Sequence, residues 1–249
     1  MLQPRFLNLG DRALTLEFGD TIDRQLVTAV AALDVRLNQE ITAGRLEGVI
    51  ETVPTFRSLT VIFDPLLLPR AVLRDRLMAV LIETATSVEQ PSRRWCLPVC
   101  YGGEYGPDLE SVAEAKDLSP EKVIDLHVGQ TYLVYMIGFL PGFPFMGDVV
   151  SELEMPRLTE PRVRVPAGSV AITGKQTAIY PWESPGGWHL LGRCPLTLFA
   201  AGRPTPALLA PGDRVAFQPV SADRYQELLE LDQGGVLDFT QFQLEGVSA

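Results

Sequence analysis

The sequence contains little cysteine and histidine, no excess of positive charge and no long hydrophobic run. Its 249 residues include three cysteines and two histidines. The formal net charge is −10, from 31 acidic and 21 basic side chains. Because a phosphate backbone is bound by clustered Lys and Arg, we expect no nucleic-acid partner. An anionic membrane surface would also repel a chain of this charge.

The hydrophobic segments are too short to cross a membrane. None approaches the roughly 18 consecutive apolar residues that indicate a transmembrane helix. The N-terminus has no basic segment followed by an apolar run, so the sequence predicts no signal peptide. We therefore expect no membrane association and a cytoplasmic location.

The cysteines are too few and too widely spaced for a disulfide framework. They stand at Cys96, Cys100 and Cys194, which is an odd number. Cys96 and Cys100 have three residues between them, whereas zinc sites usually combine closer cysteine pairs or more histidine. We therefore predict buried thiols and no tightly bound metal.

Residues 1–92 predict a small α+β domain. Apolar residues alternate over 14–18, as in a half-buried strand, and recur at helical spacing over 23–43. A pair of strands is expected over 48–53 and 59–63, and Pro69 opens a second helix. Two such strand–helix–strand halves favour a ferredoxin-like α/β layer. The polar segment Glu89–Arg94 is interpreted as a linker.

Residues 93–249 predict a second domain that is rich in short strands. A strand is expected over 97–101, followed by helices over 109–116 and 120–127 that Asp108 and Ser119 would cap. Further strands are predicted over 131–138, 163–165, 169–173, 177–180, 188–192, 196–200 and 214–217, and a last helix over 222–230 after Ser221. Short strands separated by Gly/Pro turns favour a closed barrel or a sandwich.

The segment 138–193 is the most unusual part of the chain. Of its 56 residues 15 are Gly or Pro, and large aromatic side chains stand between them. Glycine permits close approach of the backbone to a neighbour, and proline stiffens turns, so this segment predicts shaped loops. The alternative is a barrel that simply needs many tight turns.

Two features of this region suggest anion binding, and a third is ruled out by its spacing. Arg162 and Arg164 would project from the same face of an extended segment, where they would bind an anion or remain solvated. Ser184-Pro185-Gly186-Gly187 could present backbone N–H groups to an anion. Gly174-Lys175-Gln176 resembles a phosphate loop, but five residues separate Gly168 from Gly174 and Gln176 follows the lysine, so the Walker spacing is absent.

Two residues are candidates for acid–base or nucleophilic chemistry. His127 ends a predicted helix, where it would either cap the helix or serve as an acid or base. Ser184 lacks the Gly-x-Ser-x-Gly turn of hydrolase nucleophiles, so we do not expect it to be one.

Several long motifs together resemble one protein family. The motifs are Cys100–Glu104 (CYGGE), Gly138–Phe143 (GFLPGF), Pro161–Val170 (PRVRVPAGSV), Gln176-Thr177, and Tyr180–Trp188 (YPWESPGGW), which continues to Arg193. They resemble the family of the 5-oxoprolinase B subunit, also called the Kip inhibitor or allophanate hydrolase subunit 1 family. The resemblance implies a cyclophilin-like β-barrel after the small α+β domain. It also implies two partners, namely the A subunit of the enzyme, and the C subunit, which is a homologous barrel protein.

The resemblance implies three functions. The leading hypothesis is the B subunit of an enzyme that hydrolyses 5-oxoproline to L-glutamate, with ATP used by the complex. The alternatives are an inhibitor that binds a sensor histidine kinase and the carboxyltransferase half of a urea carboxylase-type enzyme.

The candidate site combines residues of the unusual segment with His127. The predicted catalytic residues are Arg162, Arg164, Lys175 and His127. The predicted substrate-binding residues are Gln176, Thr177, Tyr180, Ser184, Gly186, Gly187 and Trp188.

Overall fold

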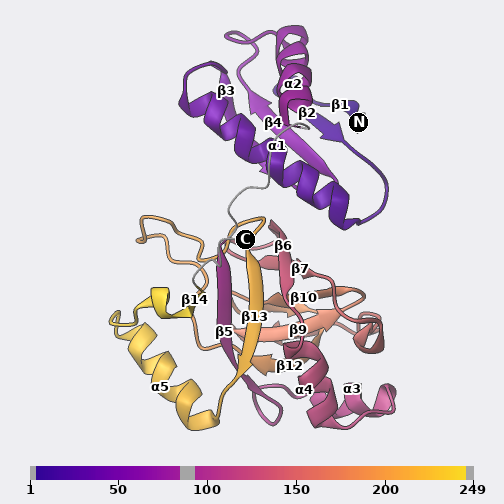
Figure 1. Cartoon of the computed structure of the whole chain (residues 1–249), viewed down its shortest axis with the longest axis vertical. Coiled ribbons are helices and arrows are strands. Elements are labelled where there is room, and N and C mark those ends of the chain that lie inside the picture. Colours follow the sequence, from indigo (N-terminus) through magenta and orange to yellow (C-terminus); the bar gives the residue numbers. More distant parts are fainter. Residues whose placement is uncertain (1–3, 85–92, 245–249) are drawn as a thin grey trace. The chain divides into compact units, whose positions relative to one another are not determined.

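The computed structural model describes residues 4–84 and 93–244 of the chain. These residues belong to two compact units, which comprise 1–91 and 92–249 (Figure 1). The expected linker lies outside the described residues except for Arg93 and Arg94. The expected domain boundary, between residues 92 and 93, stays a prediction.

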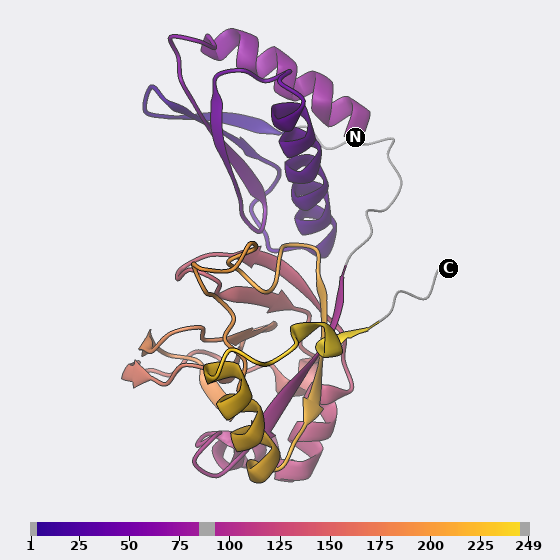
Figure 2. The ribbon, with the colours of Figure 1, turned by 90° about the vertical axis from the view of Figure 1, so that its left-hand side faces the viewer.

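The first unit is an antiparallel four-stranded sheet with two helices on one side of it (Figure 2). The sheet order is β1-β2-β4-β3. The elements are β1 (Arg5–Leu9), β2 (Ala13–Glu17), α1 (Arg24–Thr42), β3 (Val49–Pro54), β4 (Ser58–Phe63) and α2 (Arg70–Thr84). Every second residue of β4 is buried, so the alternation in the sequence correctly identifies its core face.

The predicted helices and the strand pair of this unit are confirmed, whereas β1 was missed. The helix expected over 23–43 is α1, and Asp23 caps it, because the Asp23 carboxylate accepts hydrogen bonds from the backbone N–H groups of Gln25 and Leu26. The edge strand β1 buries almost none of its side chains, so it shows no apolar alternation. It pairs with β2 at the edge of the sheet, so this N-terminal segment supplies the fourth strand.

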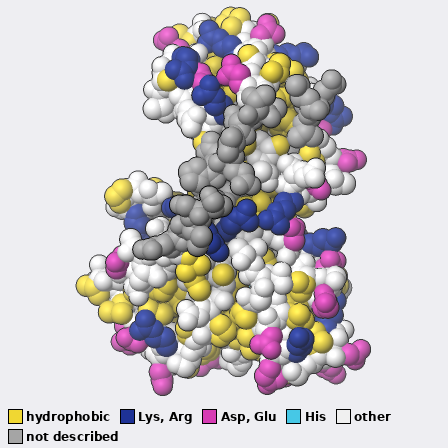
Figure 3. Space-filling model, in the orientation of Figure 1, with side chains coloured by type: hydrophobic (Ala, Val, Ile, Leu, Met, Phe, Trp, Pro, Cys, Tyr) yellow, Lys and Arg dark blue, Asp and Glu magenta, His cyan; other side chains and the backbone are white. Residues whose placement is uncertain are grey.

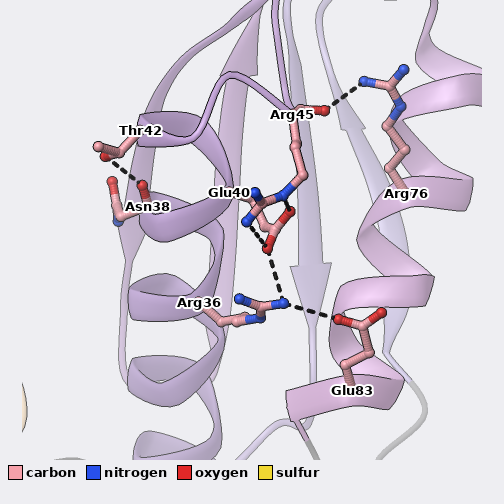
Figure 4. A network of polar contacts seen from close by, with 7 residues as sticks. All are labelled: Arg36, Asn38, Glu40, Thr42, Arg45, Arg76 and Glu83. Atoms are coloured by element: carbon pink, nitrogen blue, oxygen red, sulfur yellow. Dashed lines mark hydrogen bonds and ion pairs between the residues drawn. The ribbon is translucent and has the colours of Figure 1, made fainter.

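A network of charged side chains joins α1 to α2 (Figure 4). Glu40 lies between Arg36, at 2.9 Å, and Arg45, at 2.5 Å. Arg36 also reaches Glu83 of α2 at 3.1 Å, and Arg76 donates to the carbonyl of Arg45. The hydrogen bond from Arg45 holds the pKa of Glu40 below its usual value. The network thus stabilises the packing of the two helices.

The second unit is a closed barrel of seven strands, which confirms the expected β-barrel domain (Figure 1). The strands follow the order β12-β9-β10-β7-β6-β13-β5, and pairing of β12 with β5 closes the barrel. Their bounds are β5 (Arg94–Tyr101), β6 (Tyr132–Ile137), β7 (Pro144–Gly147), β9 (Ser169–Thr173), β10 (Gln176–Ile179), β12 (His189–Arg193) and β13 (Arg214–Pro219). β13 runs parallel to β5, and the other pairs are antiparallel.

Helices and short segments cover the barrel. They are α3 (Leu109–Ala115), α4 (Pro120–Val128), the 3₁₀ turn Ser151–Leu153, α5 (Ala222–Gln233) and the 3₁₀ turn Phe239–Phe242, after which β14 (Gln243–Leu244) pairs with β5. Ser119 and Ser221 cap α4 and α5 as predicted. Asp108 does not cap α3 with its side chain, because its carboxylate is used elsewhere.

Three strands of this unit were missed, of which one is the two-residue β14, and one strand was wrongly predicted. β7 and β11 (Ser184–Gly186) are short and contain Pro or Gly, so their pattern is typical of turns. The predicted strand 196–200 forms only an isolated bridge between Phe199 and Ala207. β8 (Arg162–Val165) leaves the barrel and pairs with β11 as a separate two-stranded ribbon.

The barrel carries apolar side chains on both faces of its wall. The larger cluster fills the interior, with Leu97, Tyr132, Val134, Val170 and Ile172 among its members. A smaller cluster lies against the opposite face of β7, β9, β10 and β12, and consists of Phe143, Val165, Ala171, Ala178, Tyr180, Trp188 and Leu190 with Leu140 and Phe145 beside it. Alternate side chains of each strand therefore serve two cores.

The surface mixes both signs of charge. Figure 3 shows acidic and basic side chains interspersed over the face that it presents, with hydrophobic side chains between them in the second unit. Among the described residues, no helix is both long and apolar enough to span a membrane.

Candidate functional site

The β8–β11 ribbon brings Gly186 against the phenol of Tyr180. Gly186 stands opposite Arg162 in the ribbon. A Cβ atom at Gly186 would lie 2.4 Å from the Tyr180 hydroxyl oxygen, so a side chain cannot be accommodated there without displacement of the phenol. The ring of Tyr180 is held in turn by an edge-on contact with Phe143, with centroids 5.0 Å apart. This close approach explains why glycine follows Pro185.

Arg162 is anchored by a buried carboxylate. Its guanidinium donates to Oδ1 of Asp108 at 2.5 Å and to the backbone carbonyl of Trp188 at 3.5 Å. The second oxygen of Asp108 accepts the backbone N–H of Leu190 at 2.7 Å. Asp108 therefore ties the ribbon to β12, and both of its oxygens are used.

Arg157 lies beside the same ribbon, although the sequence did not single it out. The backbone N–H of its neighbour Leu158 donates to the carbonyl of Gly187 at 2.8 Å. Burial raises the pKa of Tyr180 to about 12, while the positive charges of Arg157 and Arg162 act in the opposite direction. Both guanidinium groups are therefore close enough to the phenol to influence it.

We call this group the ribbon site and define it as Arg157, Arg162, Tyr180, Gly186 and Trp188. Arg157 is exposed, and within the described ranges it has no hydrogen-bond or ion-pair partner. Guanidinium groups near a phenol suit a carboxylate or a phosphate as a ligand. The site thus offers one uncommitted cation, one anchored cation and a phenol O–H.

The other two cations predicted from the sequence lie apart from the ribbon site. Arg164 forms a two-pronged pair with Glu183, at 2.9 Å for each bond, and both side chains are well exposed. The hydrogen bond from Arg164 to Glu183 accordingly raises the pKa of Arg164. Lys175 stands in the turn between β9 and β10, at the opposite end of β10 from Tyr180, and is 3.8 Å from Glu154. The two arginines of β8 therefore do not share one anion.

His127 lies in the interior of the barrel with Thr177. Its Nδ1 is 2.7 Å from the hydroxyl of Tyr101, and its Nε2 is 3.0 Å from Oγ1 of Thr177. Thr177 donates onward to the carbonyl of Ala171, so the chain of hydrogen bonds runs from Tyr101 through the imidazole to Thr177. The ring also stacks on Phe217, with centroids 4.8 Å apart.

Burial keeps this histidine neutral. It lowers the pKa of His127 to about 3, and it raises that of Tyr101 well above its ordinary value. The His127 side chain is fully buried, and its ring forms hydrogen bonds with Tyr101 and Thr177 in the core. It therefore does not act as the helix cap that the sequence offered as one alternative. His127 thus occupies the opposite face of the barrel wall from Tyr180.

The remaining predicted residues divide between these places. Ser184 stands on the ribbon opposite Val165, and its buried hydroxyl has no partner in the described part of the chain. Gln176 begins β10 next to Lys175, and its amide nitrogen is likewise buried without a partner there. Neither Gly186 nor Gly187 has a positive φ, so the alternating backbone of an anion nest is absent at this pair.

No group of three or more His, Cys, Asp or Glu side chains is arranged for a metal ion within residues 4–84 and 93–244. All three cysteines are free thiols. Burial raises the pKa of Cys194 to about 12, which makes its thiolate inaccessible at neutral pH.

Comparison with known proteins identifies the family. The family described as "Carboxyltransferase domain, subdomain C and D" matches residues 4–209. The 5-oxoprolinase B subunit of Bacillus subtilis is 41% identical over 232 residues, which cover 89% of this chain and 95% of that protein. The chain belongs to the 5-oxoprolinase B subunit family.

Solved structures of related proteins share its fold. The protein TTHA0988 is 37% identical with a TM-score of 0.74, and the match covers 85% of this chain but only 40% of that one. The Kluyveromyces lactis urea carboxylase is 20% identical with a TM-score of 0.71, and the match covers 96% of this chain and 24% of that one. The fold of this family member thus also occurs within much longer chains.

Sequence reasoning missed Arg157 as part of the ribbon site and Asp108 as the residue that anchors it. The local sequence around Asp108 indicates only a helix cap or a surface turn. Its partner Arg162 is 54 positions away in the chain, so the local pattern does not reveal the pair. Arg157 lies in a stretch without regular structure and carries no motif. One signal was available in the sequence. Three arginines, at 157, 162 and 164, lie within a stretch of eight residues, although the chain as a whole is acidic.

Proposed function

We propose that this chain is the B subunit of an ATP-dependent 5-oxoprolinase, which acts with the A and C subunits to convert 5-oxoproline to L-glutamate. The observation that carries the proposal is the 41% identity to a 5-oxoprolinase B subunit over 95% of that protein's length. ATP would be used by the complex. The chain would contribute part of a site that its partners complete.

The ribbon site supplies the chemistry that this reaction needs from the chain. 5-Oxoproline carries a carboxylate, and hydrolysis of its lactam adds negative charge to the ring carbonyl oxygen as water attacks. Arg157 is the uncommitted cation of the site, and the phenol of Tyr180 is a neutral donor at neutral pH. We propose that Arg157 binds the substrate carboxylate or the developing anion.

The experiment reconstitutes the chain with the A and C subunits of the same organism and measures ATP-dependent glutamate release. Arg157→Ala is expected to lower kcat/KM at least ~10-fold without a change in melting temperature, and Arg157→Lys to restore part of the activity. The double variant Arg164→Ala with Lys175→Ala tests the competing sequence-based assignment. If Arg157→Ala kept full activity, the role of the ribbon site would be refuted, but the proposed function would not.

The function itself is tested by the unmodified complex. No glutamate from the complete set, in an assay where the Bacillus subtilis 5-oxoprolinase is active, would refute the proposal.

A carboxyltransferase role is the second candidate. It is favoured by the description of the matched family and by the shared fold of urea carboxylase. It requires a biotinylated partner, so transfer of a carboxyl group from carboxybiotin to urea, dependent on this chain, would support it over the first. The kinase-inhibitor hypothesis stays a prediction.

A further inference from the structure

His189 joins the barrel wall to the segment that carries Arg157. It is the first residue of β12 and pairs with Ile172 of β9, so its backbone belongs to the barrel. Its Nε2 lies 2.8 Å from the carbonyl oxygen of Pro156, the residue before Arg157. Because a carbonyl oxygen only accepts hydrogen bonds, Nε2 must carry the proton and donate it. The contact therefore requires the Nε2–H form of the ring.

The ring of His189 has no second hydrogen-bond partner in the described part of the chain. The residue is only 8% exposed, and its Nδ1 is buried without a partner among residues 4–84 and 93–244. A buried polar atom without a partner lowers stability, whereas an apolar side chain would avoid that loss. The bond to Pro156 is thus the hydrogen bond that histidine provides here and an apolar residue would not.

The segment around Arg157 belongs to no helix or strand and is held by hydrogen bonds to its neighbours. On one side, the carbonyl of Met155 accepts the N–H of Gly174 at 2.5 Å and the hydroxyl of Thr173 at 3.3 Å. On the other side, the N–H of Leu158 is bonded at 2.8 Å to the residue that follows β11. The imidazole bond lies between these two contacts, directly before Arg157. The backbone is therefore held on both sides of an arginine whose side chain is exposed.

Three consecutive residues at the start of β12 reach both arginines of the ribbon site. The carbonyl of Trp188 accepts from Arg162 at 3.5 Å, and the imidazole of His189 holds the residue before Arg157. The N–H of Leu190 donates to the same carboxylate that anchors Arg162. One short stretch of the barrel wall thus connects to both segments that carry the cations of the site.

We propose that His189 is a positioning residue, which holds the backbone of Arg157 so that its guanidinium meets the anionic group of the substrate. This inference rests on the proposed function. A cation on a segment that is held in advance loses less conformational entropy on binding than one on a loose segment. His189 does not touch the substrate itself, because it acts through Pro156 and Arg157.

The kinetic test uses the reconstituted complex of the A, B and C subunits and measures ATP-dependent glutamate release. The variants are His189→Gln and His189→Asn, because a glutamine amide reaches the position of Nε2 and an asparagine amide does not. We expect His189→Asn to lower kcat/KM at least ~10-fold and His189→Gln to keep most of the activity. Thr173→Val is the control and should match the wild type, because the N–H of Gly174 still occupies the Met155 carbonyl.

A double-mutant cycle shows whether the histidine acts through the arginine. If it does, His189→Asn combined with Arg157→Ala should be as active as Arg157→Ala alone. His189→Asn should also change the same kinetic parameter, kcat or KM, as Arg157→Ala does. Losses that multiply in the double variant would overturn the inference, because a general structural effect of the substitution persists without Arg157.

Hydrogen exchange of the full chain tests the positioning without an enzyme assay. The N–H of Leu158 should exchange at least ~10-fold faster in His189→Asn than in the wild type, and at the wild-type rate in His189→Gln. An unchanged rate in His189→Asn would refute the inference and leave the proposed function intact. If the wild-type complex releases no glutamate where the Bacillus subtilis enzyme does, the proposed function fails, and the role of Arg157 fails with it.

Discussion

Asp108 is the residue whose removal should most clearly reveal how the ribbon is held. Replacement of Asp108 by Ala leaves the N–H of Leu190 buried without an acceptor, which costs about 1–3 kcal/mol. It also removes the carboxylate partner of Arg162, whose side chain is 29% exposed and can partly rehydrate, so this adds only about 1 kcal/mol. We expect a loss of about 3 kcal/mol in the free energy of unfolding. For a domain of this size that corresponds to a decrease in melting temperature of about 6–12 °C.

The assay is urea and thermal unfolding of the Asp108 variants, followed by tryptophan fluorescence. Asp108→Asn keeps an acceptor for Leu190 and should lose only about a third as much free energy as Asp108→Ala. Glu183→Gln, which weakens the exposed pair with Arg164, is the control and should unfold like the wild type. Wild-type stability of Asp108→Ala, or equal destabilisation by Glu183→Gln, would refute the conclusion that Asp108 anchors the ribbon.

Two further predictions concern the barrel. His127 has a folded pKa of about 3 and an unfolded value near 6.5, so below pH 6.5 the unfolded state binds the additional proton. Stability should therefore fall by up to about 1.4 kcal/mol per pH unit as the pH decreases from 6.5 towards 5, and His127→Gln should flatten this slope in urea titrations. A wild-type slope near zero would show that the imidazole is not held neutral by burial. Gly106→Ala should prevent stable folding, because the new Cβ would lie 1.9 Å from the carbonyl oxygen of Leu191. Gly202→Ala, with open space around it, should match the wild type in expression and melting temperature.

The ribbon site draws on the segment 138–193 in two ways. Its polar groups gather around Tyr180, whose ring rests on the outer apolar cluster. The start of β12, from Trp188 to Leu190, connects the barrel to the segments that carry Arg162 and Arg157. The same rigid part of the barrel would then support both the phenol and the two cations.

The sequence by itself determined the elements whose signal is local. Apolar spacing specifies α1, and Ser119 with Pro120 begins α4, because these patterns act within a few residues. The Gly/Pro-rich motifs identified the family and located the unusual segment. They also indicated Arg162, Tyr180 and Gly186 as candidates before their positions were known.

Only the tertiary structure decided which of these residues meet. Asp108 pairs with Arg162 across 54 positions of the chain, and no periodicity encodes such a contact. The alternation of β10 sends Thr177 to the interior with His127 and its neighbour Ala178 to the outer cluster, so adjacent residues lie on opposite faces of one wall. β7 and β11 were missed because Gly and Pro favour turns, and only the pairing of β7 with β6 and β10 and of β11 with β8 overrides that preference.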